Sequence, residues 1–416
     1  MKYFFLISAF ILGILSFSSF GEEEDHNIFK FDINSEGGTQ TLRENSPINP
    51  SNSLRLNEVA MFTRAGIQVE NSSLPNTKGM LKLEGIYAPT SFTRTDLTGP
   101  SRQNTVYLKA GYIDLLQEGF TLRIGKQFIN WGSGIFFSPL DIINHHRDPL
   151  RPLDEAEGNS FWRLSVPILS SGVSELYVVY PVDQGTQNEI KKKDMFIVPK
   201  IGSSMGAFSW WAMAKLQTSK RAQWGGNLSY AFSPMQYVDT TLFAEGIIRN
   251  ERTKYNIDSQ KKTVGDFSAY LIGLQNRYSL STCTFLDGIN FDFEFYTDKN
   301  NWSNKEMILF EENIRNGLLT SPQARLLFVP FTNSQKYFFA HLGLENFIFR
   351  HVKMGGSFIY NENDQSYLTY AEINYIFGKQ NGQLGFKYNV FTGRAKSEMG
   401  DYPIKNVSQL SLSLSF

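Results

Sequence analysis

Apolar and polar residues alternate with a period of two along most of the chain. The stretch "NFDFEFYTD" carries Phe291, Phe293 and Phe295 at its odd positions. The even positions between them hold Asp292 and Glu294. Because successive side chains of a strand point to opposite faces of its sheet, each set occupies one face. The pattern predicts strands that are apolar on one face and polar on the other.

Such segments of about ten residues recur to the end of the chain, separated by Gly, Asn, Asp, Ser or Lys. We expect strands to begin near residues 54, 80, 104, 119, 160, 173, 194, 206, 223, 237, 264, 289, 323, 336, 351, 366, 383 and 405. Strand directions counted from the two ends of this series disagree, which indicates a miscount of one between residues 298 and 350. The stretch 305–319 is either a strand or a helix in a loop. The chain is therefore expected to be all-β with about 18 strands, and 16 to 20 remain open.

The connections between these segments differ in length in a regular way. Tight turns are expected at 117–119, 170–172, 203–206 and 233–235. The connections that alternate with them are longer, at 130–159, 181–193 and 250–263. Short turns at one end and long loops at the other are typical of a transmembrane antiparallel up-and-down β-barrel.

Composition narrows the class of protein further. The 40 basic and 40 acidic residues give a net charge of zero, which argues against nucleic acid as a partner. The mean hydropathy of −0.27 excludes a helical membrane protein, because each helical span needs about 20 consecutive apolar residues. A membrane barrel is compatible with it, since only every second residue of a strand meets lipid. The lone Cys283 excludes an intrachain disulfide and a zinc cluster.

The first residues have the three-part design of a secretory signal. Lys2 precedes the apolar run 3–15, and small residues follow it. We expect residues 1–21 to be a cleaved signal peptide, with a retained N-terminal anchor as the alternative. Residues 22–50 are polar and irregular, so they are expected to form an extension or a short plug. The barrel is expected to occupy residues 51–416.

Together these features resemble a Gram-negative outer-membrane β-barrel of the porin-like superfamily. The resemblance implies a place in the bacterial outer membrane, with lipid and the barrel-assembly machinery as partners. In that superfamily a last strand with a C-terminal aromatic residue is the assembly signal, which "SQLSLSLSF" would supply here. Its lipid-facing residues would be Leu410, Leu412, Leu414 and Phe416, with Gln409 and the serines facing the lumen. A homo-oligomer stays open.

The connection 130–159 departs most from the strand pattern. It is rich in Gly, Pro and charge, and loops of this length are usually functional or disordered. It also contains Trp131, Phe136, Phe137 and Leu140, which suit a solvated loop poorly. We therefore expect the loop to fold inward against the barrel wall and to form a constriction. The alternative is an outward loop whose charges are solvated.

Charged residues of both signs are the candidates for lining this constriction. Those in the loop are Asp141, His145, His146, Arg147, Asp148, Arg151, Asp154, Glu155 and Glu157. Those on the polar faces of strands are Arg64, Arg123, Glu245, Arg249, Arg277, Asp292, Glu294 and Lys387. Loop acids facing wall arginines would create a transverse field, and fixed charges in a narrow path select solutes by sign.

The most direct function is a channel for passive diffusion of small hydrophilic solutes. The alternative is a plugged transporter of hydrophobic molecules or a polymer exporter, in which 22–50 fills the lumen and Phe339 and Phe391 face inward. A structural or adhesive barrel would conduct nothing. No Ser motif with nucleophile geometry is visible, so no enzyme is predicted. His145 and His146 would point apart on an extended chain, so neither a metal nor a cofactor is predicted.

Overall fold

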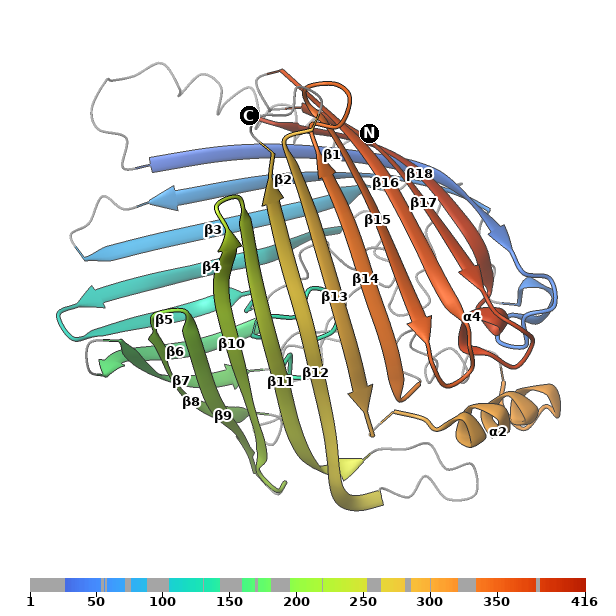
Figure 1. Ribbon diagram of the computed structural model, residues 1–416, viewed down its shortest axis with the longest axis horizontal. Coiled ribbons are helices and arrows are strands. Elements are labelled where there is room, and N and C mark those ends of the chain that lie inside the picture. Colours follow the sequence, from blue (N-terminus) through green and yellow to red (C-terminus); the bar gives the residue numbers. More distant parts are fainter. Residues whose placement is uncertain are drawn as a thin grey trace.

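The protein is a single antiparallel sheet of 18 strands closed into a barrel (Figure 1). The computed structural model describes residues 27–53, 56, 58–71, 76–87, 105–129, 131–142, 159–168, 171–180, 195–218, 220–252, 263–280, 286–299, 301–320, 334–378 and 382–416. Strands pair with their neighbours along the chain, and β1 (Asn27–Leu42) closes the ring by pairing with both β2 (Val59–Asn71) and β18 (Ile404–Ser415). The expected fold class and the favoured number of strands are confirmed.

The other strands follow in chain order around the ring. They are β3 (Thr77–Tyr87), β4 (Thr105–Gln117), β5 (Phe120–Gln127), β6 (Asn159–Ile168), β7 (Gly172–Tyr180), β8 (Phe196–Met205), β9 (Phe208–Gln217), β10 (Gln223–Met235), β11 (Val238–Arg252), β12 (Thr263–Ser279), β13 (Gly288–Asp298), β14 (Lys336–Glu345), β15 (Val352–Asn361), β16 (Tyr367–Phe377) and β17 (Gly382–Thr392).

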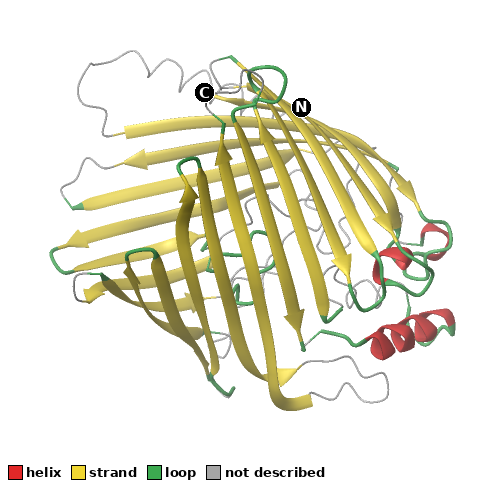
Figure 2. Cartoon of the chain, viewed as in Figure 1, coloured by secondary structure: helices red, strands yellow, loops and turns green. Residues whose placement is uncertain are grey.

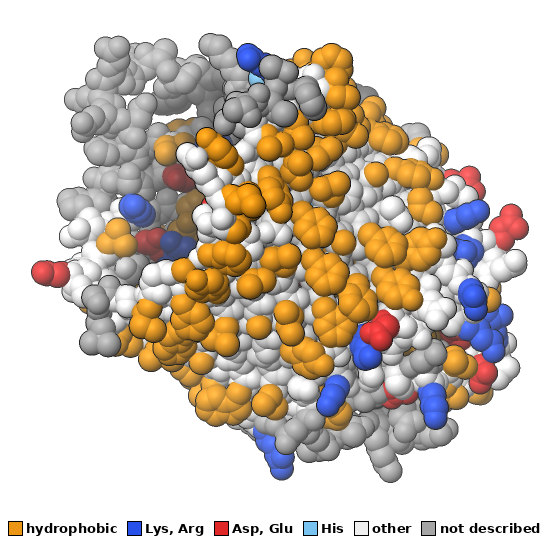
Figure 3. All heavy atoms as spheres, in the orientation of Figure 1, with side chains coloured by type: hydrophobic (Ala, Val, Ile, Leu, Met, Phe, Trp, Pro, Cys, Tyr) orange, Lys and Arg blue, Asp and Glu red, His pale blue; other side chains and the backbone are white. Residues whose placement is uncertain are grey.

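The outer face of the wall is apolar, as the alternation predicts. In the last strand Leu410 and Leu412 are 57% and 40% exposed. Phe291 and Phe293 of β13 also face outward, while Asp292 between them is buried. Hydrophobic side chains cover most of the wall that faces the viewer in Figure 3. An apolar outer surface of this extent suits contact with lipid tails, because apolar surface is driven out of water.

The two ends of the barrel differ, because tight turns alternate with long loops. Two residues each separate β4 from β5, β8 from β9 and β10 from β11. The opposite end carries η1 (Pro50–Asn52), α2 (Asn304–Arg315) and α4 (Glu398–Asp401) (Figure 2). We call this end the loop end. Among the described residues, no helix is both long enough and apolar enough to cross a bilayer.

The expected N-terminal extension over residues 22–50 is wrong for Asn27–Leu42, which form β1 in the wall. This strand contains polar residues and adjacent glycines, which weaken its alternation. Gly38 is needed there, because a Cβ atom would lie 2.2 Å from the carbonyl oxygen of Ser408. A residue that reads as loop from its sequence is therefore required by the close approach of β1 to β18.

The uncertain stretch 305–319 contains a helix and no strand. The strand expected near residue 323 lies outside the described residues. The sequence count missed β1 at the beginning, so each strand from β2 to β13 was counted one position too early. This offset explains why the strand directions counted from the two ends disagreed.

Candidate functional site: a loop bound to the inner wall

The loop between β5 and β6 reaches the inner face of strands well around the ring. Residues 131–142 of this loop have no regular secondary structure. They contact side chains of β9 to β14 that alternate with the outward apolar residues of those strands. Residues 131–142 therefore lie inside the barrel, and we call them the inner loop.

The first anchor of the inner loop is Glu245, on the inner face of β11. Its carboxylate accepts hydrogen bonds from the backbone N–H groups of Ser133 and Gly134, the second at 2.9 Å. The hydroxyl of Ser138 donates to the same carboxylate at 3.1 Å. The side chain is only 3% exposed, so these donors replace the water that a carboxylate otherwise binds.

The second anchor is Glu294, on the inner face of β13. The backbone N–H groups of Ile135, Phe136 and Phe137 donate to its carboxylate, the last at 3.0 Å. Glu294 is 1% exposed. Five consecutive N–H groups of the loop thus bind two wall carboxylates. Such charge-assisted bonds are roughly twice as strong as neutral ones, so they define the path of the loop.

Four further wall side chains bind the inner loop. Asn227 donates to the hydroxyl of Ser133 at 3.1 Å, and Gln275 donates to its carbonyl at 2.7 Å. Arg249 donates to the carbonyl of Pro139 at 3.1 Å and to the carboxylate of Asp298 at 2.8 Å. Lys215 reaches the carbonyl of Ile142 at 3.4 Å. These bonds satisfy both the donors and the acceptors of an irregular backbone, as burial requires.

The apolar residues of the inner loop pack against aromatic side chains of the wall. Trp131 lies edge-on to Tyr177 of β7, with ring centroids 4.9 Å apart. Phe137 stacks on Tyr296 at 4.7 Å and on Tyr337 at 5.3 Å. The inner wall near the loop end is thus partly aromatic. Burial of these rings stabilises the loop by hydrophobic and ring-stacking contacts.

Two glycines allow close contacts of the inner loop, one with its anchor Glu245 and one within the loop itself. A Cβ atom on Gly132 would lie 2.4 Å from a carboxylate oxygen of Glu245, and one on Gly134 would lie 1.9 Å from the carbonyl oxygen of Phe137. Gly132 also has a φ of +116°, which side chains rarely permit. Both positions therefore require glycine for steric reasons.

The inner face of β2 to β8 carries a series of ion pairs. Glu84 lies 3.0 Å from Lys109 and 4.0 Å from Arg64. Further along, the nitrogens of Lys200 and Arg163 lie 2.9 Å and 3.9 Å from the carboxylate of Glu175.

A third group completes this series. The guanidinium of Arg123 makes two hydrogen bonds to the carboxylate of Asp114. Cations outnumber acids in the three groups taken together, so this stretch of wall has a positive excess.

The predicted constriction residues lie in different places in the structure. Asp141 belongs to the inner loop, and Arg249 contacts that loop directly. Glu245 and Glu294 lie beneath the loop as its anchors, so they are covered by it. Arg277 donates to Asn290 at 3.2 Å on the inner wall, and Asp292 and Lys387 lie on inner faces of β13 and β17. His145, His146, Arg147, Asp148, Arg151, Asp154, Glu155 and Glu157 lie outside the described residues.

The predicted pairing of loop acids with wall arginines stays a prediction, and the contacts described above are of another kind. Wall acids bind loop N–H groups, and Arg249 binds a loop carbonyl. The aromatic residues that receive the loop, such as Tyr177 and Tyr337, were also missed. Their signal is a break in alternation, as in "KYFFAHLG", where both faces of the strand are apolar near the loop end. In the described part of the chain, no group of three or more His, Cys, Asp and Glu could hold a metal ion.

The fold can be compared with known proteins at this point. No family model matches the sequence. No curated protein matches it either. The structure is similar to OccAB1 of Acinetobacter baumannii, with a TM-score of 0.63 at 9% identity over 94% of this chain and 97% of that one. It is also similar to the outer membrane protein OpdK of Pseudomonas aeruginosa, with a TM-score of 0.59 at 8% identity over 94% of this chain and 99% of that one.

A second structure of OpdK was determined with vanillate, and the same TM-score of 0.59 applies at 8% identity over 95% and 100% of the two chains. At such identities the likeness shows the fold alone. The chain has the fold of an outer-membrane β-barrel, as the sequence pattern indicates.

Proposed function

We propose that the protein is an outer-membrane channel for passive diffusion of small hydrophilic solutes, in which the inner loop forms the constriction. A barrel of about 16 to 18 strands is wide enough to leave an aqueous channel. The observation that carries the proposal is the binding of residues 133–137 to Glu245 and Glu294. A loop held inside a wide barrel narrows the path through it.

The charge of the inner wall supports a preference among solutes. The ion pairs of β2 to β8 leave an excess of Lys and Arg over Asp and Glu. Fixed charge along a narrow path raises the local concentration of the opposite sign. We therefore expect anions to pass more readily than cations of the same size.

The plugged transporter is not favoured. Its plug was assigned to residues 22–50, and Asn27–Leu42 of that stretch form β1 in the wall. Two inward aromatic residues, Phe339 and Phe391, are each 1% exposed and pack in the apolar cluster of the loop end. Neighbouring side chains cover them, so they do not form an apolar path for hydrophobic molecules through the barrel. We expect no enzymatic activity.

The first test is single-channel recording of the refolded protein in a planar bilayer. Heat-modifiable mobility on gels would first establish that the barrel is folded. Stable openings, with a reversal potential in a KCl gradient that indicates an anion preference, are the expected result. A correctly folded barrel that conducts nothing would rule the proposal out. Swelling of proteoliposomes in sugars of increasing size would then measure the size limit.

A further inference from the structure

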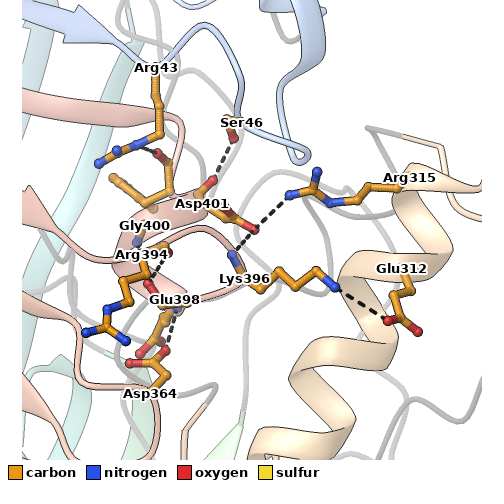
Figure 4. A network of polar contacts seen from close by, with 12 residues as sticks. Arg43, Ser46, Glu312, Arg315, Asp364, Arg394, Lys396, Glu398, Gly400 and Asp401 are labelled. Atoms are coloured by element: carbon orange, nitrogen blue, oxygen red, sulfur yellow. Dashed lines mark hydrogen bonds and ion pairs between the residues drawn. The ribbon is translucent and has the colours of Figure 1, made fainter.

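Three loops meet at the loop end of the barrel, and polar contacts join them (Figure 4). They are the β1–β2 loop, the β13–β14 loop with α2, and the β17–β18 loop with α4. From the first loop, Arg43 donates to the carbonyl of Phe391 at 3.0 Å, and Ser46 donates to the carbonyl of Asp401 at 2.6 Å. The β1–β2 and β17–β18 loops are thus fastened to each other.

Helix α2 is attached to this pair of loops by apolar contacts and by ion pairs. Met307, Phe310 and Ile314 are buried in the apolar cluster of the loop end. Arg315 lies 3.7 Å from the carboxylate of Asp401, and Lys396 lies 3.7 Å from that of Glu312 (Figure 4). Both ion pairs are partly solvated, so each contributes little to docking.

Glu311 is an acidic residue on the buried side of α2. Its spacing of four from Met307 and three from Ile314 places it on the buried stripe of α2, where an apolar residue is expected. It is 0% exposed, and its carboxylate oxygens accept no hydrogen bond from an N–H group of the described residues. The neighbouring group with the strongest effect on it is the carboxyl group of Asp401, which lies 3.7 Å from Arg315, one turn further along α2. Two carboxyl groups can form a hydrogen bond only when one of them carries a proton.

We propose that the Glu311–Asp401 carboxyl pair is a proton-operated latch that holds α2 against α4 and releases it when the shared proton is lost. The charged groups around the pair come from each packed element. They are Arg315 from α2, Lys396 from the β17–β18 loop and Arg43 from the β1–β2 loop. Arg43, Arg315 and the backbone N–H of Lys396 favour the charged form of Asp401, so Glu311 holds the proton.

The direction of the pH dependence follows from this arrangement. Burial, followed by the charge of Asp401, raises the pKa of Glu311 from 4.5 to about 9. Between pH 4.5 and about pH 9, Glu311 therefore keeps its proton in the docked helix and loses it in the released helix. Docking is strongest at acidic pH, weakens as pH rises through this window, and loses the contribution of the proton above about pH 9. Linkage of one proton weakens docking by about tenfold per pH unit within the window.

The test is a distance measurement between α2 and the wall. Nitroxide labels would be attached to Leu309→Cys, on the exposed face of α2, and to Thr369→Cys, on β16, in a Cys283→Ser background. Double electron–electron resonance would then be recorded from pH 6 to pH 10 in detergent or nanodiscs. We expect one narrow distance at pH 6 that broadens and shifts as pH approaches 10.

Matched variants separate the latch from general effects of pH. In Glu311→Gln the amide can donate to Asp401 at every pH, so the distance is expected to stay narrow up to pH 10. Lys305→Gln, at an exposed position of the same helix, should behave as the parent does. Asp401→Asn offers a second neutral partner if Glu311→Gln folds poorly. The proposal is overturned if the parent does not change by pH 10, or if Glu311→Gln broadens as the parent does.

A divalent cation between the two carboxylates is the competing arrangement. In that case chelator would broaden the distance at pH 6, and calcium would keep it narrow at pH 10. Either result would overturn the shared proton. The distance measurement does not depend on conduction, so it tests the latch even if the proposed channel function fails. If both hold, the conductance of the parent should rise from pH 6 to pH 10 and that of Glu311→Gln should not.

Discussion

Glu245 and Glu294 determine where the inner loop lies. Both are buried on the inner wall, and together they accept five consecutive backbone N–H groups. No side chain of the loop has to be charged for this to work. The loop could therefore vary in sequence and keep its path, provided that the two wall carboxylates and the close-approach glycines are kept.

Replacing Glu294 by Ala should loosen the inner loop. The change leaves three N–H groups in a buried place without their acceptor, at a cost of about 1–3 kcal/mol for each that stays unsatisfied. We expect single-channel recordings with more frequent flicker and a higher mean conductance than the parent. Glu372→Ala is the matched control, because Glu372 lies on the inner face of β16 and binds Tyr370. Equal noise in both variants would argue against the anchor.

Gly132→Ala should displace the inner loop from Glu245. The added methyl group would meet a carboxylate oxygen of Glu245 at 2.4 Å, in a backbone conformation with a φ of +116°. Gly119 has a φ of +93°, and a Cβ atom there would meet nothing within 4 Å, so Gly119→Ala carries comparable backbone strain without the clash. We expect altered conductance only for Gly132→Ala. If both variants conduct as the parent does, the contact at Gly132 does not position the loop.

At the scale of elements, the seam between β1 and β18 completes the wall. The two strands pair from Asp32↔Ser415 to Leu42↔Ile404. The rings of Phe31 and Phe416 stack at 6.1 Å, and their backbones exchange hydrogen bonds of 3.0 and 2.8 Å. Phe416 thus has a structural contact beside its predicted role as an assembly signal.

Phe416→Ala separates these two roles. Loss of the ring removes the contact with Phe31, which should slow refolding into vesicles only modestly. A lost assembly signal should lower the amount of folded barrel in cells by a much larger factor. The measurement is heat-modifiable mobility, in vitro and in cell envelopes, with Leu412→Ala as the control on the same face. An equal defect in both settings would make Phe416 a structural residue alone.

Strand periodicity predicts most elements, and it fails where another requirement determines the sequence. The outward residues Leu410 and Leu412 need only be apolar, so alternation reveals them. Gly38 of β1 is required by close approach to β18, so its strand reads as a loop. In α2 the buried stripe includes Glu311, which disguises a helical period that Met307, Phe310 and Ile314 otherwise carry.

The site could be predicted to the same limited extent. Trp131, Phe137 and Leu140 indicated that the loop packs against something, and they are buried. The choice of Glu245 and Glu294 as anchors could not be predicted. This choice depends on which inward-facing acid lies opposite each N–H group of the loop. That position is determined by the register of strands that are far from the loop in the sequence. Charge alone suggested pore lining for both residues, because burial is not visible in sequence.

At the scale of the whole molecule, the net charge of zero conceals an uneven distribution. The inner wall of β2 to β8 carries an excess of cations around Glu84, Asp114 and Glu175. A solute that crosses the barrel experiences this local excess of positive charge. The net charge of the whole chain does not describe what it experiences there. Composition therefore excludes a strongly charged surface and says little about the lumen.

Lys200→Gln should lower the expected anion preference. Of the two described ion pairs of Glu175, the one with Arg163 at 3.9 Å would remain, and the wall would lose one positive charge. We expect the reversal potential in a KCl gradient at about 0.1 M salt to shift in the direction that indicates a weaker preference for anions over cations. The difference should vanish at about 1 M, where the Debye length falls to about 3 Å. Lys336→Gln, at the exposed end of β14, is the control, and an equal shift there would count against the inner wall.

The closed ring also determines how the protein can fail. Every strand of a closed ring has a neighbour on both sides. The second neighbour of β1 is β18, where Ser415 donates a hydrogen bond to Asp32 across a separation of 383 positions in the sequence. Until that partner arrives, the growing sheet has two open edges that can template pairing with another chain. A chain without either seam strand would keep both edges for good. Its expected fate is to join with a second copy and aggregate, since a smaller pore would need a new shear and a new curvature.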